Sequence, residues 1–211
     1  MKNKLYAAFF ASAFIVGGAA QGAVTVSIKN FSSATVGVPI VNSAGAAVPL
    51  NTIWASAGIF ATTLPNWATA TASQVLGLFT ALDATPVASG TFTGLFTAND
   101  MLSGTYPLNF SGTSAYILVG NAAVLANSTA IAVYSTGSSF TAVDGAGNAN
   151  VGLNATNAAN WVYGITRSVT TQPTVTSGAY TTGVQLTSIP EPSAALLGAL
   201  GALGLLRRRR I

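Results

Sequence analysis

The chain contains no cysteine and no histidine. Without histidine, neither a Ser-His-Asp triad nor its histidine-dependent variants can be assembled. Without cysteine there is no thiol nucleophile and no disulfide. The lack of both residues excludes a zinc site with the usual nitrogen and sulfur ligands. Few groups are left for catalysis or metal binding.

Charge is also scarce, because only 6% of the residues are charged, against about 25% in a typical globular protein. The formal net charge is +4, and six of the eight basic residues lie at the two ends: Lys2, Lys4 and Arg207–Arg210. Residues 24–189 have a net charge of −1, from Lys29, Arg167, Asp83, Asp100 and Asp144. A nucleic-acid surface needs clustered lysine and arginine on the folded body. Nucleic-acid binding is therefore excluded.

Carboxylates are the remaining catalytic option. The segments GLFTALD (77–83) and GLFTAND (94–100) agree at six of seven positions and end in Asp83 and Asp100. Two carboxyl groups about 5–10 Å apart would suit glycoside hydrolysis. However, aspartate also favours turns, and we predict that both residues start turns.

Two further patterns are weaker. Ser27 lies two residues before Lys29 on the same face of a predicted strand, where we expect a solvated or ion-paired lysine. The segment DGAGNANVGLN (144–154) lacks both the alternating ligands and the final glutamate of a calcium loop. We interpret it as a Gly/Asn-rich turn. The sequence predicts no enzymatic activity, no cofactor and no metal site.

The first 22 residues have the three parts of a secretory signal peptide. Lys2 and Lys4 precede an apolar stretch from Leu5 to Val16, and small residues follow, with cleavage expected after Ala20 or Gly22. This pattern predicts export.

The C-terminal residues 189–211 combine three features in a fixed order. Pro190, Glu191 and Pro192 come first, the uncharged run Ala194–Leu206 follows, and then come Arg207, Arg208, Arg209 and Arg210. The run would form a helix about 20 Å long, against a hydrocarbon core of about 30 Å. The arginines should stay cytoplasmic. We expect this segment to hold the protein transiently at the inner membrane. A plain single-span anchor is the alternative.

This order resembles the PEP-CTERM sorting signal of Gram-negative bacteria, and the resemblance covers residues 189–211 only. It implies passage through the export machinery and processing by an exosortase near Pro190-Glu191-Pro192. It also implies delivery to the cell surface or extracellular matrix of bacteria that make exopolysaccharide. It implies no particular fold for the body, because one sorting tag serves many unrelated domains.

Residues 23–188 are predicted to form the exported domain, an all-β or mostly β single antiparallel sandwich. Strands are expected at 24–29, 114–120, 129–136 and 160–170, where the sequence alternates or is rich in β-branched and aromatic residues. Turns are expected at 42–45, 135–139 and 144–148. A short helix is expected over 72–82, with Thr71 as N-cap. A signal helix and a transmembrane helix flank the domain.

Two functions follow. The first is an exported structural or interaction protein associated with exopolysaccharide. The second is a glycan-binding module that uses exposed aromatic side chains. The tryptophans are Trp54, Trp67 and Trp161. We interpret them as core residues, and the glycan-binding hypothesis requires one or two of them to be exposed.

Overall fold

The computed structural model describes residues 23–33, 36–49, 52–60, 64–82, 88–103, 110, 112–122, 127–140, 149–173 and 180–189. The predicted signal helix and the predicted transmembrane helix lie outside the described residues.

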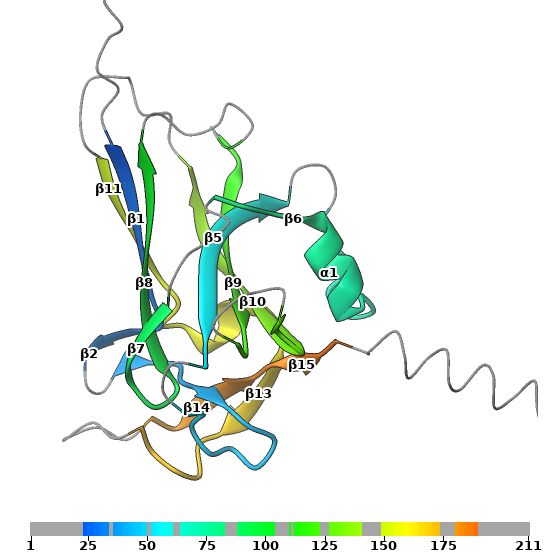
Figure 1. Cartoon of the computed structure of the whole chain (residues 1–211). Coiled ribbons are helices and arrows are strands. Elements are labelled where there is room, and N and C mark those ends of the chain that lie inside the picture. The colour runs from blue at the N-terminus through cyan, green and yellow to red at the C-terminus, as the bar shows by residue number, and fades with distance from the viewer. Residues whose placement is uncertain are drawn as a thin grey trace, which may run out of the picture.

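A four-stranded sheet forms one layer of the molecule (Figure 1). Its strand order is β11 (Ala149–Asn154), β1 (Ala23–Lys29), β8 (Leu95–Ser103) and β7 (Ala88–Phe92). Strand β1 pairs antiparallel with β8 and parallel with β11.

A six-stranded sheet forms the second layer. Its order is β12 (Trp161–Tyr163), β10 (Ala130–Ser139), β9 (Ser114–Gly120), β5 (Trp54–Phe60) and β6 (Phe79–Ala81), with β15 (Thr187–Ser188) also paired to β10. The smaller pieces are β2 (Phe31–Ser33), β3 (Val36–Gly37), β4 (Ile40–Val41), β13 (Ile165–Ser168), β14 (Thr182–Gln185), α1 (Ala72–Leu78) and the 3-10 turn η2 (Ala158–Asn160).

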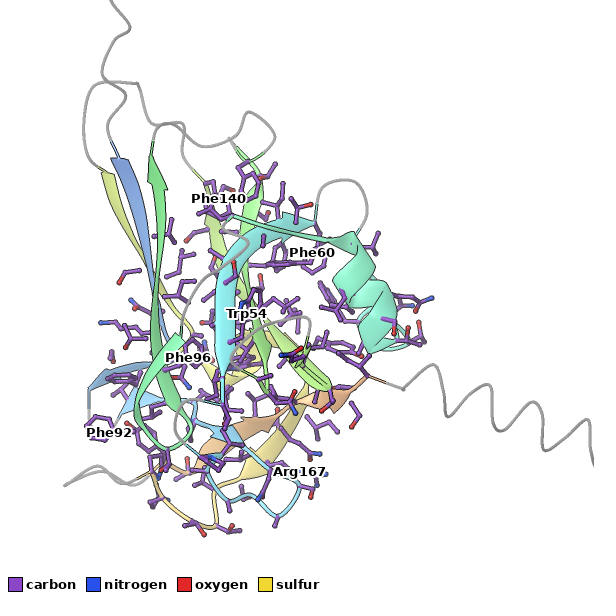
Figure 2. All side chains as sticks on the ribbon, in the orientation of Figure 1. Trp54, Phe60, Phe92, Phe96, Phe140 and Arg167 are labelled. Carbon is purple, nitrogen blue, oxygen red and sulfur yellow. The ribbon has the colours of Figure 1, made fainter. Side chains whose placement is uncertain are left out.

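The two large sheets enclose the inter-sheet core. Val26 and Phe96 from the four-stranded sheet share this core with Ala57, Ile117 and Ala132 from the six-stranded sheet, and all five are fully buried. Phe96 lies inside the molecule between the layers (Figure 2). The prediction of a mostly β, sandwich-like body with one short helix is confirmed.

The outer face of the six-stranded sheet is also buried, under α1 and residues 64–70. The helix-side core consists of Trp54, Ala72, Val75, Tyr116, Leu118, Ile131, Val133 and Tyr163. Strand residues therefore alternate between two apolar environments. This explains why SAYILVG (114–120) is a nearly continuous apolar run and not an apolar–polar alternation.

Helix α1 begins as predicted but ends earlier. Thr71 caps it through a capping box, in which the Gln74 backbone N–H donates to the Thr71 hydroxyl and Gln74 Oε1 accepts from the Thr71 N–H. The predicted extension to residue 82 is wrong, because residues 79–81 form β6 and pair with β5. Gly77 weakens the helix by about 1 kcal/mol relative to alanine. The edge of β5 offers residues 79–81 a backbone ladder instead.

One predicted turn and the second half of another are strands, and the turn predicted at 144–148 lies outside the described residues. The STGSS segment (135–139) lies within β10, because a register shift opposite β9 and a left-handed Gly137 (φ +67°) absorb the glycine as a bulge. Residues 149–154, the second half of the predicted Gly/Asn-rich turn, are β11. Pairing with β1 holds them extended.

The turn predicted at Asp100 is also wrong, because Asp100 lies within β8, opposite Val26 of β1. The strand predicted over 160–170 divides into β12 and β13 at Gly164, whose φ is +125°. The turn at 42–45 is present, and Asn42 Oδ1 accepts from the N–H groups of Ala44 and Ala46.

Candidate functional site

The described chain ends on a strand that is firmly attached to the body. In β15, Thr187 pairs with Ile131 and Ser188 with Ala130 of β10. The N–H of Ile189 then donates to the carbonyl of Thr129 at 2.7 Å. The next residue, Pro190, has no N–H and cannot extend this donor series. The backbone is therefore fixed up to the residue before Pro-Glu-Pro.

The Tyr163 hydroxyl links β15 to the segment before α1. It donates to the Ala70 carbonyl at 3.3 Å and also hydrogen-bonds with the Thr187 side chain. Burial raises the pKa of Tyr163, and the bond to Thr187 opposes that shift. Ile189 packs, partly buried, against the helix-side core. The junction between body and tail is thus part of the helix-side structure.

An open groove of about 280 Å³ lies beside α1. Its lining residues are Leu64, Pro65, Asn66, Thr69, Ala70, Gln74 and Leu78. The polar side chains there already serve local structure, since Gln74 completes the capping box and Asn66 Oδ1 accepts from the Ala68 N–H at 3.2 Å. Leu64 and Leu78 are 53% and 38% exposed. The groove therefore presents apolar side chains and few uncommitted polar groups.

A second hollow of about 200 Å³ has a more polar lining, which includes Asn42, Asn121 and Gln185. Asn42 closes its own turn, and Asn121 Oδ1 accepts from the N–H groups of Thr129 and Ala130. Gln185 Oε1 accepts from Arg167 Nε at 2.8 Å. These polar groups stabilise the fold, so the hollow has little to offer a ligand.

The tryptophans form no stacking platform in the described part of the chain. Trp54 and Trp161 are core residues, 2% and 9% exposed. Trp67 is half-buried, and its ring meets Phe60 edge-on, with 5.3 Å between centroids and 81° between planes. A flat pair of aromatic faces, which a sugar-binding surface uses, is not formed by these rings.

The predicted catalytic candidates lie on two strands or outside the described residues. Asp83 and Asp144 lie outside the described residues, and Asp100 lies in β8. Ser27 and Lys29 lie on β1, two residues apart. Within the described ranges, no three residues of the metal-binding types gather into a group. The predicted pairing of Asp83 with Asp100 lies outside what the described residues test.

The decisive observation is at the C-terminus, where residues 188–210 match the PEP-CTERM protein-sorting motif. This chain carries a PEP-CTERM sorting signal. It is therefore an exported protein that an exosortase sorts. The match begins at Ser188, the last residue of β15. Pro190, Glu191, Pro192 and Arg207–Arg210 fall within the match and outside the described residues.

No curated protein and no solved structure matches this chain. Among the helices that the structure describes, none is long and apolar enough to cross a membrane.

Sequence reasoning missed strand β15 and its attachment to the body. A signal was present, because Val184 and Leu186 alternate with Gln185 and Thr187 immediately before the motif. The role of Tyr163 left no such trace, since its partners Ala70 and Thr187 are distant in sequence.

Proposed function

We propose that this PEP-CTERM protein is a structural or interaction protein without enzymatic activity, delivered to the cell surface or extracellular matrix. The apolar run Ala194–Leu206 holds it transiently at the inner membrane. An exosortase then processes the chain near Pro190-Glu191-Pro192. The observation that carries the proposal is the sorting motif at residues 188–210.

The attachment of β15 supports processing at this point. The last backbone hydrogen bond from the body reaches Ile189. A cut after Ile189 therefore removes none of the pairing between β15 and β10. The released body would keep both of its cores.

The nature of the body supports a passive role. Residues 24–189 carry only five charged side chains, and the two described hollows use their polar groups for local structure. Serine and threonine are abundant in the sequence, and their uncharged hydroxyl groups suit contact with a hydrated exopolysaccharide. We propose such a polysaccharide as the partner.

A glycan-binding module remains the second candidate, and it rests on Trp67, the tryptophan with the least complete burial. A pull-down on the polysaccharide of the producing cell would compare the native protein with Trp67→Ala. Retention that Trp67→Ala abolishes supports this candidate, and equal retention of both proteins contradicts it.

Two variants of the full chain test the sorting proposal. Deletion of 190–211 should give a folded, exported protein that is not delivered to the surface. Changing Pro190, Glu191 and Pro192 to alanine keeps the apolar run and the arginines, and should leave an uncleaved protein in the membrane fraction. Surface delivery of the deletion variant, or processing of the alanine variant to the mature wild-type mass, would overturn the proposal.

A further inference from the structure

Leu64 and Leu78, two of the large apolar side chains that are exposed in the described structure, line the same groove. Leu64 and Leu78 are 53% and 38% exposed, and both line the groove beside α1. They come from the two ends of the segment that covers the helix-side core. Single exposed leucines are ordinary, but apolar side chains gathered on one surface mark a contact site.

The groove lies close to the point where the chain leaves the body. Ala70 lines the groove, and its carbonyl accepts from the Tyr163 hydroxyl, which also bonds with Thr187. Both hydrogen bonds share the Tyr163 hydroxyl oxygen. The Ala70 carbonyl oxygen and the Thr187 hydroxyl oxygen therefore lie within about 6 Å of each other. Figure 1 shows α1 beside the end of β15. The groove runs along α1, and the helix from Ala72 to Leu78 is only about 10 Å long. Leu78 therefore lies within about one short helix length of Ala70.

The length of the tail restricts what can lie next to this surface. Residues 190–193 are all that separate Ile189 from the apolar run that starts at Ala194. Five residue steps span at most about 18 Å. If the run 194–206 is in the bilayer, the side of the body that bears Ile189 cannot lie farther than this from the membrane.

The charge distribution permits direct contact with lipid. Residues 30–82, which include the whole groove, contain no charged side chain, and neither do residues 168–190. Placing these two segments on a bilayer therefore desolvates no ionised side chain of their own, and desolvation of charge would be the largest opposing cost.

We infer that Leu64 and Leu78 form a lipid-contact surface that seats the body against the bilayer until processing releases it. The inference rests on the proposed membrane attachment through 194–206. Contact is apolar, so it does not weaken as salt is raised, unlike the binding of a basic patch.

The absence of cysteine provides a direct test, since one introduced cysteine gives one labelled site. Three variants of the full chain are compared in phosphatidylcholine vesicles whose acyl chains carry nitroxide quenchers: Leu64→Cys, Val36→Cys and Leu197→Cys. Each carries an environment-sensitive fluorophore. Val36 is 49% exposed on β3, which pairs with β2 on the side of the molecule opposite α1, so it is the matched control (Figure 1). Circular dichroism verifies that each labelled chain is folded.

The expected result is strong lipid quenching at positions 64 and 197, several-fold weaker quenching at 36, and no effect of salt. Quenching at 197 without quenching at 64 overturns the lipid-contact surface and leaves the membrane attachment intact. Absence of quenching at both positions overturns the two together. A blue-shifted label at 64 that lipid does not quench places a protein segment in the groove, and contradicts the inference. Equal quenching at 64 and 36 also contradicts it.

Discussion

The two faces of the six-stranded sheet are covered in different ways. The inner face packs against a complete second sheet, with fully buried residues such as Phe96 and Ile117. The outer face is covered by one seven-residue helix and the segment before it, and Leu64 and Leu78 stay exposed there. The thinly covered outer face is the one from which the C-terminal tail leaves the body, since Ile189 packs against the helix-side core.

This difference separates stability from delivery. The helix-side core contacts the tail junction through the side chains of Tyr163 and Ile189. Among the described residues, the inter-sheet core reaches it only through Leu186, which precedes β15, and Ala130, which pairs with Ser188. Damage to the first core should unfold the body. Damage to the second should loosen the junction and the proposed membrane contact first.

The largest effect should come from Asn30, which is fully buried on the sandwich side. Its Nδ2 donates to the carbonyls of Val38 and Gly94, both at 2.9 Å, and its Oδ1 accepts from the Phe96 N–H at 2.8 Å. Asn30→Ala leaves three buried groups without these partners, so we expect a loss of about 3 kcal/mol or more in the free energy of unfolding.

Urea denaturation measures this loss, with the exposed Asn127→Ala as control. The control should lie within about 0.5 kcal/mol of the native protein. Equal losses for Asn30→Ala and Asn127→Ala would contradict a stabilising role for the three buried hydrogen bonds of Asn30.

An intermediate effect is expected at the helix-side cap. Thr71→Ala removes the hydroxyl that accepts from the Gln74 N–H at 3.3 Å. The loss should be about 1 kcal/mol. It should appear in hydrogen exchange as faster exchange of the α1 amides, while the amides of β8 are unaffected. Ser73→Ala, an exposed change within the same helix, is the control. Uniform acceleration across both sheets would mean that the two faces are not energetically separate.

The smallest effect concerns alkaline pH. Burial raises the pKa of Tyr116 and of Tyr163 above the ordinary value of 10.0, and both belong to the helix-side core. As pH rises, these phenols ionise in the unfolded chain before they ionise in the folded protein. Their contribution to the free energy of unfolding is therefore complete below pH 10 and is lost as pH rises through the folded pKa values.

Unfolding measured from pH 8 to pH 11 should show this decline, and Tyr116→Phe and Tyr163→Phe should each reduce it. Tyr180, whose pKa burial also raises, lies outside both cores and gives a comparison variant, Tyr180→Phe. A decline that begins well below pH 9, or one that both helix-side substitutions leave unchanged, would exclude these tyrosines as its cause.

The features that could be predicted from the sequence are those that local residues determine. The strand Ser114–Gly120 and the Thr71 cap follow from β-branched content and capping chemistry within a few residues. Non-local pairing decides the features that were missed. Residues 135–139 have the composition of a turn, but β10 continues through them along β9, with a bulge at Gly137.

The same division applies to the functional site. The sorting motif is contiguous, so the order of Pro-Glu-Pro, apolar run and arginines identifies it without a structure. The groove depends on Leu64 and Leu78, and its position near the chain exit depends on Tyr163. Leu64 lies before α1 and Leu78 at its end, and Tyr163 reaches Ala70 and Thr187 only in the folded chain, so no local pattern marks these residues.

The most direct test of sorting at the β15 junction is the intact mass of the protein recovered from the exterior of its native cell. The expected mass lacks residues 1 to about 22, as for a cleaved signal peptide, and ends at or just beyond Ile189. A mass that still includes Arg207–Arg210 would mean that the tail is a permanent anchor, and would contradict processing at the end of β15.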